Sequence, residues 1–158
     1  MLRLIPPALH RVLLVQAHRV RLIWWRARRP VLQGCRVLAL GQSGDVLLVR
    51  HSYGSGRWML PGGGIGRGET AITAACRELA EETGCTLRNA ACIAVIEEPL
   101  SGAINRVHII AGHAEGWPKA DGREIVEARF FAEDGLPHDL AQQLQDNLAD
   151  WIRTAKAG

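Results

Sequence analysis

The sequence lacks the features that mark several specialised classes of protein. Its four cysteines, Cys35, Cys76, Cys85 and Cys92, form no C-x-x-C pair, so their spacing indicates neither a disulfide framework nor a zinc site. The longest apolar runs near the start, VLLV and LIWW, are four residues each, whereas a membrane-spanning helix needs about 20. These absences leave one globular domain with reduced thiols, for which we expect a cytoplasmic location and no membrane span.

Acidic residues are missing from the first 44 positions, which contain eight arginines. This part of the chain has a net charge of +8 and the remainder one of −5. We assign residues 1–35 to a basic amphipathic N-terminal arm and residues 36–158 to the folded domain. Such an arm can bind nucleic acid, acidic lipid or a phosphate-rich substrate. Because its arginines alternate with large apolar residues, we favour packing on the domain or on the second subunit of a homodimer.

The rest of the sequence predicts a β-sheet with helices. Two apolar runs around a Gly-Gln-Ser-Gly-Asp turn predict a β-hairpin within residues 35–51, and further strands are expected over residues 92–98, 106–114 and 127–133. A helix is predicted over residues 70–83, opened by Thr70 and closed by Gly84. A second helix is predicted after Pro137. Its apolar positions recur with a helical period: Leu140, Leu144, Leu148, Trp151, Ile152 and Ala155.

The helix over residues 70–83 carries three glutamates within one turn. Relative to Glu78, Glu82 lies about 40° round the helix in one direction and Glu81 about 60° in the other. Arg77, four residues before Glu81, can pair with it. A solvated acidic face would scatter its charges and mix their signs, so this bunching favours a site for a hard divalent cation. The apolar face for the sheet is expected on another arc, at Ile72, Cys76, Leu79, Ala80 and Thr83.

A glycine-rich loop comes directly before this helix. Residues 52–69 contain seven glycines and a proline, a composition that is typical of a loop, either ordered or flexible. Gly62, Gly63 and Gly64 would let the backbone approach a metal ion or a phosphate closely. The fixed distance from this loop to the acidic helix makes a shared site more specific than either feature alone.

Together the loop and the helix resemble the Nudix box. Gly63 is followed at the spacing of that motif by Glu69, Arg77, Glu78, Leu79, Glu81, Glu82 and Gly84. Cys85 stands where the family usually has an aliphatic residue, and cysteine is small and apolar enough for a buried position. On these residues, 63–85, the chain is identified as a member of the Nudix hydrolase family. The resemblance implies an α/β fold, the Nudix α/β/α sandwich with a mixed β-sheet between helices.

The resemblance also implies a reaction. Family members hydrolyse the pyrophosphate bond in a nucleoside diphosphate linked to another moiety, using Mg²⁺ or Mn²⁺ to neutralise the diphosphate and activate a water for attack on phosphorus. By position, the metal ligands would be Glu78, Glu81, Glu82 and the backbone carbonyl of Gly62.

Other positions of the box would have supporting roles. Glu69 and Arg77 would brace the loop against the helix, with Arg77 orienting a ligand carboxylate. Gly63 and Gly84 would be structural positions of the box. For the proton acceptor the resemblance leaves two choices, Glu78 or a glutamate on a loop well after the box.

Three glutamates after the box are candidates for that later position: Glu115, Glu124 and Glu127. We favour Glu124 because it follows the GWPKADGR loop, although a plain surface acid is an equally good interpretation. Glu127 begins a predicted strand, which favours a structural role. His108 and His113 are five residues apart, so they face opposite sides of one strand and do not indicate a two-histidine metal site.

Several residues near the glycine-rich loop are candidate substrate contacts. Arg50 and His51 end the strand before the loop, where they could meet a phosphate, as could Arg57. Gly63 and Gly64 offer backbone N–H groups to the same ligand. For Trp58 we favour a hydrophobic position beneath the loop over a contact with a base.

Two alternatives to a small-nucleotide pyrophosphohydrolase stay open. One is a regulatory module that has the same fold and senses nucleotides. In such modules the acidic residues of the box are usually replaced, whereas here they are all present. The other is a hydrolase of RNA 5′ ends that uses the basic arm, so nucleic acid is a possible but less favoured partner. No substrate signature is recognisable in the sequence.

Overall fold

The computed structural model describes residues 31–100 and 103–157, so residues 1–30 of the predicted arm lie outside the described part. In chain order the elements are β1 (Val31–Leu40), β2 (Val46–His51), β3 (Trp58–Met59), α2 (Ala71–Thr83), β4 (Thr86–Leu100), β5 (Ala103–Glu115), β6 (Ile125–Phe131), the 3-10 helix η2 (Glu133–Gly135), α3 (Gln142–Gln145) and α4 (Leu148–Ala157). None of the helices among the described residues is long and apolar enough to cross a membrane.

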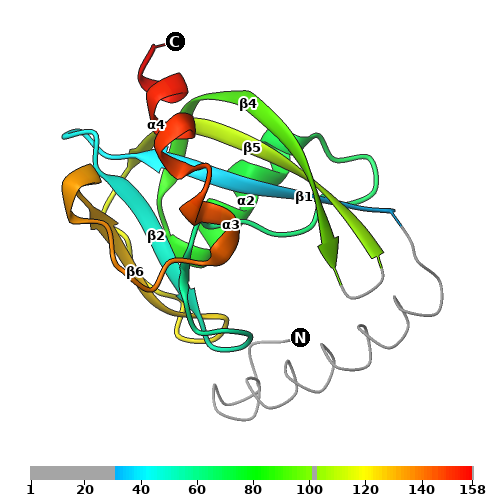
Figure 1. Cartoon of the computed structure of the whole chain (residues 1–158), viewed down its shortest axis with the longest axis horizontal. Helices are drawn as coiled ribbons and strands as arrows, with labels where there is room; N and C mark the ends of the chain where they lie inside the picture. Colours follow the sequence, from blue (N-terminus) through cyan, green and yellow to red (C-terminus); the bar gives the residue numbers. More distant parts are fainter. Residues whose placement is uncertain (1–30, 101–102, 158) are drawn as a thin grey trace.

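The sheet is mixed, and two of its central strands, β1 and β2, are paired at one end only. Its strand order is β3-β2-β1-β5-β4, with β6 on β2. The pair β1–β5 is parallel, and the others are antiparallel. The predicted hairpin of β1 and β2 is present, but these strands pair only at Leu40 and Val46. Beyond that point the two strands diverge (Figure 1).

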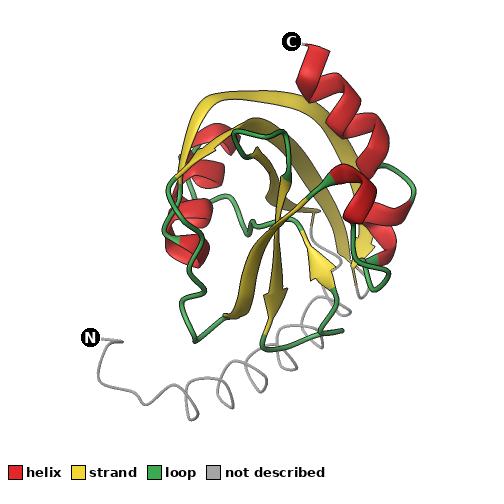
Figure 2. Ribbon diagram, turned by 90° about the vertical axis from the view of Figure 1, so that its left-hand side faces the viewer, coloured by secondary structure: helices red, strands yellow, loops and turns green. Residues whose placement is uncertain are grey.

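Helices cover both faces of the sheet, as Figure 2 shows. Alternate residues of β1 enter two hydrophobic clusters, since successive side chains of a strand point to opposite faces. Cys35, Val37 and Ala39 pack with α2, whereas Leu38 and Leu40 pack with α3 and α4. The predicted α/β/α sandwich is therefore confirmed.

The glycine-rich loop is ordered and bound to β1. Val37 N donates to the carbonyl of Pro61 at 2.8 Å, and Cys35 N donates to that of Gly63 at 2.9 Å. Ile65 N donates to the carbonyl of Gln33 at 3.0 Å. The loop thus takes the place beside β1 that β2 leaves, and it brings its glycines to the edge of α2.

Helix α2 begins and ends as predicted. The Thr70 hydroxyl accepts a hydrogen bond from Thr73 N, and Gly84 closes the helix in the left-handed conformation with φ of 72°. The predicted apolar face was wrong in part: Ile72 is 40% exposed and Ala80 is exposed. The buried residues are Ala74, Ala75, Leu79, Glu82 and Thr83. The glycine-rich loop covers the part of α2 next to the sheet. The buried side of the helix therefore includes Glu82, one of the three clustered glutamates.

The C-terminal helix is interrupted and begins later than predicted. Trp58 N donates to Asp139 O at 3.0 Å, and Ala141 N donates to Trp58 O at 2.8 Å. Residues 139–141 therefore pair with β3 and cannot join a helix, so α3 begins at Gln142, and α4 follows as a separate helix from Leu148. The predicted apolar face is correct all the same: Leu140, Leu144, Leu148, Trp151 and Ile152 are buried, and Ala155 packs against their cluster.

The first residues of β1 lie within the segment assigned to the arm. Val31–Cys35 pair with Ile104–His108 of β5. The folded part seen here therefore includes five residues before position 36. The arm itself stays a prediction.

A substitution at Ile152 tests how much the packing of α4 on the sheet contributes to the stability of the fold. Its side chain is fully buried in the cluster of α3 and α4. We expect Ile152→Ala to lower the free energy of unfolding by about 2–5 kcal/mol, because it leaves a cavity. The neighbouring Arg153→Ala, at an exposed position, should cost at most about 1 kcal/mol. Equal effects in urea denaturation would show that α4 is peripheral.

Candidate active site

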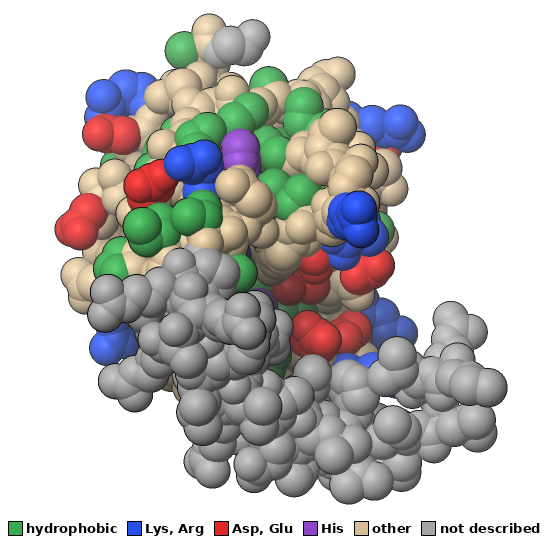
Figure 3. Space-filling view, turned by 90° about the vertical axis from the view of Figure 1, so that its right-hand side faces the viewer, with side chains coloured by type: hydrophobic (Ala, Val, Ile, Leu, Met, Phe, Trp, Pro, Cys, Tyr) green, Lys and Arg blue, Asp and Glu red, His purple; other side chains and the backbone are tan. Residues whose placement is uncertain are grey.

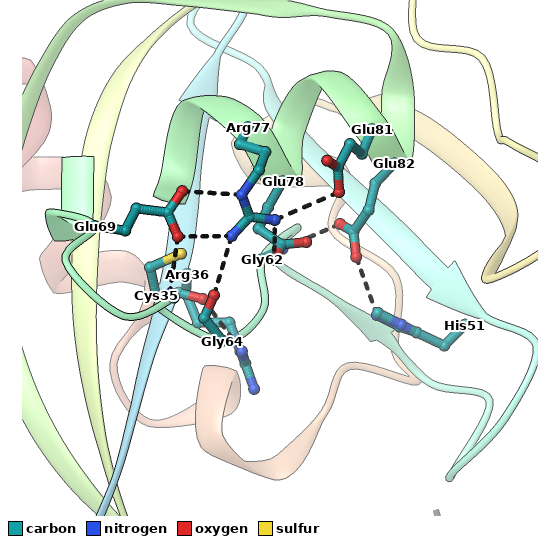
Figure 4. A network of polar contacts seen from close by, with 11 residues as sticks. Cys35, Arg36, His51, Gly62, Gly64, Glu69, Arg77, Glu78, Glu81 and Glu82 are labelled. Atoms are coloured by element: carbon teal, nitrogen blue, oxygen red, sulfur yellow. Dashed lines mark hydrogen bonds and ion pairs between the residues drawn. The ribbon is translucent and has the colours of Figure 1, made fainter. Parts of the chain in front are cut away.

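Arg77 joins the glycine-rich loop to the carboxylate face of α2 (Figure 4). Its guanidinium holds Glu69 through two hydrogen bonds, Nε to Oε1 at 2.9 Å and Nη2 to Oε2 at 3.0 Å. Nη1 donates to Glu78 Oε1 at 2.7 Å and to Glu81 Oε2 at 3.4 Å, and Nη2 also donates to Gly64 O at 3.1 Å. The predicted pairing with Glu81 is present, although Glu69 and Glu78 are the closer partners. One cation thus offsets the repulsion among three carboxylates.

Glu69 is fixed from the loop as well as from the helix. Its Oε2 accepts a hydrogen bond from Gly66 N at 2.8 Å. The hydrogen bonds from Arg77, and then that from Gly66, lower the pKa of Glu69 to about 2. The same contacts with Glu69, followed by those with Glu78, raise the pKa of Arg77. The bracing contacts expected of Glu69 and Arg77 are therefore in place, with both groups charged.

Two loop glycines lie where a side chain would collide. A Cβ at Gly63 would come within 2.5 Å of Glu78 Oε1. A Cβ at Gly62 would strike the carbonyl oxygen of Cys35, and Gly62 has φ of 145°, which other residues rarely adopt. Gly64, in contrast, has open space at the Cβ position. The Glu78 carboxylate thus packs directly on the loop backbone because position 63 has no side chain.

Glu82 is the buried member of the carboxylate group. Its side chain is only 7% exposed, and its Oε1 lies 3.7 Å from Nε2 of His51. Its Oε2 accepts a hydrogen bond from Gly62 N at 3.0 Å. Burial raises the pKa of Glu82 to about 8; the Gly62 hydrogen bond opposes this shift, and the charge of Glu78 adds to it. Ionised Glu82 is costly in this position, and a nearby cation would offset the cost.

His51 approaches Glu82 from the end of β2, on the side away from Arg77 (Figure 4). Its side chain is 10% exposed. Both ring nitrogens are buried and have no hydrogen-bond partner among the described residues. Burial, and then the charge of Arg36, lower the pKa of His51 to about 4, while Asp121 opposes the shift. Buried polar atoms are normally hydrogen-bonded. We therefore expect the neutral imidazole of His51 to form a hydrogen bond with a bound ligand.

The other two basic residues predicted to contact substrate have different surroundings. Arg50 binds Glu127 at 2.9 Å and Asp139 at 2.8 Å, with its guanidinium 4.6 Å from the Trp58 ring. Arg57 is exposed before β3 and forms no ion pair with the described residues. Trp58 is 4% exposed and lies in the core, in agreement with the hydrophobic position predicted for it. Substrate contacts of Arg50 and Arg57 stay predictions.

The three later glutamates also differ in their surroundings. Glu115 pairs with an arginine of β4 at 2.8 Å, and Glu127 with one of β2 at 2.9 Å. Glu124 lies on the loop beside the end of β2, where its carbonyl accepts a hydrogen bond from Ser52 N at 2.8 Å. After burial and the nearer groups, the charge of Glu124 also helps to raise the pKa of Glu82. Glu124 is therefore near enough to the box for its charge to act on Glu82.

Cys85, directly after the Gly84 cap, is fully buried in the hydrophobic cluster formed with α2. The aliphatic role expected at this position stays a prediction.

The donor set of this region suits Mg²⁺ or Mn²⁺. Its atoms are carboxylate oxygens and a backbone carbonyl, the hard ligands that these ions prefer. Among residues 31–100 and 103–157, no three His, Cys, Asp or Glu side chains already converge on one point. Glu78 and Glu81 turn toward Arg77 instead. Since Mg²⁺ uses one or two carboxylates and completes its shell with water and phosphate oxygens, a closed cage is not required.

Arg36 is a candidate that the sequence does not reveal. It lies on β1 at the end of a series of eight arginines, and nothing in the spacing sets it apart. In the structure its charge acts on both His51 and Glu82. Only the tertiary fold brings it to the site.

Gly63 and Gly64 form a matched pair for testing the packing of the loop on Glu78. We expect Gly63→Ala to lower the free energy of unfolding by about 1–3 kcal/mol, because the methyl group displaces the carboxylate or the loop. Gly64→Ala should have little effect, since its methyl group meets no atom within 4 Å. Urea denaturation measures both. A harmless Gly63→Ala would contradict the packing described.

Glu82 should make the stability of the metal-free protein depend on pH. Its pKa is about 8 in the folded protein and near its ordinary value of 4.5 when unfolded. Between these values the folded state keeps a proton that the unfolded chain has lost. The contribution of Glu82 to stability should therefore fall as pH rises through this range, by up to about 1.4 kcal/mol per pH unit, and level off above pH 8. Because the lowered pKa of His51 has the opposite effect up to about pH 6.5, the net fall is expected between about pH 6.5 and 8.

Urea denaturation in EDTA at several pH values measures this dependence. Glu82→Gln, which stays neutral, should flatten the slope. Glu81→Gln, whose parent side chain is 62% exposed, should retain it. An unchanged slope in Glu82→Gln would assign the pH dependence to another group.

Comparison with known proteins agrees with this geometry. A family model for the NUDIX domain matches residues 32–153. A Bacillus subtilis (strain 168) protein provisionally named an 8-oxo-dGTP diphosphatase is 35% identical over 125 residues, which cover 78% of this chain and 82% of that protein. The NAD-capped RNA hydrolase NudC of Vibrio atlanticus (strain LGP32) is 27% identical over 132 residues, which cover 80% of this chain but 49% of NudC.

A solved structure gives the same result. The crystal structure of a MutT NUDIX hydrolase from Burkholderia pseudomallei superposes with a TM-score of 0.68 at 28% identity, covering 76% of this chain and 96% of that one. The family match spans most of the chain, and it includes every box residue that Arg77 connects. The chain therefore belongs to the NUDIX domain family and is a Nudix hydrolase.

Proposed function

We propose that this Nudix pyrophosphohydrolase cleaves the pyrophosphate bond of a nucleoside diphosphate linked to another moiety, with Mg²⁺ or Mn²⁺ as cofactor. The observation that carries the proposal is Glu82, a carboxylate 7% exposed, placed between a glycine N–H and His51, whose ring nitrogens have no hydrogen-bond partner in the described part of the chain. Such a group gains most from a divalent cation and from the diphosphate that the cation brings.

The cation would be held by Glu78, Glu81, Glu82 and the carbonyl of Gly62. When bound, it supplies the positive charge that neutralises the diphosphate and lowers the pKa of the attacking water. These four positions belong to α2 and to the loop that Arg77 fixes, so their spacing is set before a substrate arrives.

The remaining chemistry falls to the side chains around the box. We assign the proton acceptor to Glu124, because the Glu78 carboxylate is already engaged by Arg77 Nη1 at 2.7 Å. His51 can donate one ring N–H to a phosphoryl oxygen, and the loop offers the backbone of Gly63 and Gly64. Arg77 keeps Glu78 in position and does not itself face the substrate.

RNA 5′ ends are the second candidate substrate. The NudC relatives carry a name that refers to NAD-capped RNA, but this chain spans about half the length of the Vibrio protein. The arginines of the N-terminal arm would supply sequence-independent affinity for an RNA backbone. On the face drawn in Figure 3, acidic and basic side chains of described residues lie side by side instead of forming one large basic patch. We therefore place small nucleotides first.

The cytoplasmic location and the homodimer expected from the sequence remain predictions. A sensing module without catalysis would bind nucleotides and leave them intact. The experiment below separates that outcome from hydrolysis.

A chromatographic screen for the two products of pyrophosphate-bond cleavage, a nucleoside monophosphate and a second phosphate ester or pyrophosphate, tests the proposal. The panel contains nucleoside diphosphate sugars, dinucleotides, nucleoside triphosphates including 8-oxo-dGTP, and NAD-capped RNA, each with Mg²⁺ and with Mn²⁺. We expect turnover of a small nucleotide that EDTA abolishes. Glu82→Gln should lower kcat/KM by on the order of a hundredfold or more, because a charged ligand is lost.

Glu124→Gln tests the assigned proton acceptor in the same screen. It should lower kcat by about 10²–10⁴-fold while Mn²⁺ affinity is kept. Glu115→Gln is the matched control, since Glu115 is paired with an arginine of β4. Parental rates in Glu82→Gln would refute the metal assignment, and nucleotide binding without turnover of any substrate would favour a sensing module.

A further inference from the structure

Arg36 is a partly buried cation that no carboxylate neutralises. Its Nη1 donates to the carbonyl of Cys35 at 3.3 Å. Within the part of the chain that the structure describes, no acidic side chain lies at ion-pair distance from it. Two other half-buried arginines of this region, Arg50 and Arg77, hold two and three carboxylates respectively. Arg36 therefore keeps positive charge available beside the site.

The direction of Arg36 follows from the alternation along β1. Cys35 and Val37 face α2, and Leu38 faces α3 and α4. Arg36 therefore points away from α2, on the other side of the glycine-rich loop from Arg77 (Figure 4). There it lines a small hollow with apolar and polar neighbours: Met59, Ile96, Trp151, Glu98 and Gln143.

The charge of Arg36 also reaches the carboxylate site. After burial, it is the largest influence that lowers the pKa of His51. It likewise opposes the raised pKa of Glu82, behind burial, Gly62 and Glu78. The pairing of the loop with β1 also places Arg36 beside the site, because a Cβ at Gly62 would lie 3.0 Å from the Cα of Arg36. Arg36 thus lies between the box and the hollow.

Arg50 and Arg77 cannot take a phosphate without giving up a carboxylate partner, whereas Arg57 is exposed before β3. Arg77 uses all three of its nitrogens on Glu69, Glu78, Glu81 and Gly64. A guanidinium has five N–H donors, and the contact of Arg36 with Cys35 uses one of them. Its free edge can bind a phosphate through two parallel hydrogen bonds.

We propose that Arg36 is a substrate-binding residue that holds a nonbridging oxygen of the diphosphate, on the hollow side of the glycine-rich loop. The inference rests on the proposed function, because it names a further contact of the same substrate. It gives the diphosphate a direction: one phosphoryl group lies toward the box, and the other lies beside Arg36.

Two other roles would leave Arg36 where it is. It could act only as a counterion for Glu78 and Glu82, or it could bind the nucleobase in the hollow. A ligand without a base separates these roles. Inorganic pyrophosphate has the phosphoryl oxygens and nothing else, so a phosphate contact affects its binding and a base contact does not.

The test is calorimetric titration of the full chain with inorganic pyrophosphate and with ADP, in Mg²⁺. Arg36→Gln should weaken the binding of both ligands by at least about tenfold. Arg36→Lys should restore part of the affinity, because lysine keeps the positive charge but lacks the paired N–H donors of the guanidinium. The control Arg106→Gln, which removes an exposed ion pair with Glu97, should bind as the parent does. Mn²⁺ affinity without phosphate should be unchanged or higher in Arg36→Gln.

Several outcomes would overturn the inference. Unchanged pyrophosphate binding would do so, and weakened ADP binding alone would assign Arg36 to the base. Loss of Mn²⁺ affinity in Arg36→Gln, with pyrophosphate binding intact, would make it a structural residue. If Arg36→Gln does not fold, Arg36→Lys with parental affinity for pyrophosphate would refute the paired hydrogen bonds. If the parent chain binds pyrophosphate through Arg36 but hydrolyses no substrate, the inference stands and the proposed hydrolysis fails.

Discussion

The Arg77 guanidinium is the interaction on which the site depends. It binds Glu69 and Gly64 of the loop and two glutamates of α2 at the same time. Without it, the loop would lose most of its hydrogen bonds to the helix, and Glu78 and Glu81 would repel each other and Glu69 unopposed. The close spacing of acids in α2 is tolerated because this one cation lies among them.

Glu82 is the acid that Arg77 does not reach. It lies one turn further on, under the loop and beside His51, and its burial makes ionisation costly. His51 from β2 and the charge of Arg36 from β1 act on this position. The site therefore has two halves. In one half, Arg77 partly offsets the charge of Glu69, Glu78 and Glu81. The other half, around Glu82, gains from a cation and an anionic ligand.

Much of this arrangement could be predicted from the sequence, because it rests on local signals. The spacing from Gly63 to Gly84 gives the helix, its cap and the residues that meet at Arg77. What could not be predicted depends on contacts between distant segments. The loop covers α2 and buries Glu82, and β3 binds residues 139–141 and delays α3. Arg36 reaches the site only because the glycine-rich loop pairs with β1 beside it, and no local pattern shows that.

Mn²⁺ binding to the parent chain and to Glu82→Gln tests the central claim most directly. Electron paramagnetic resonance counts the free ion during a titration at pH 8, with Glu115→Gln as the control. If Glu82 is the carboxylate that the cation neutralises, its substitution should raise the Kd by at least about tenfold, and the control should match the parent. Equal affinities in all three proteins would contradict the account, because the buried carboxylate would then have no part in holding the metal.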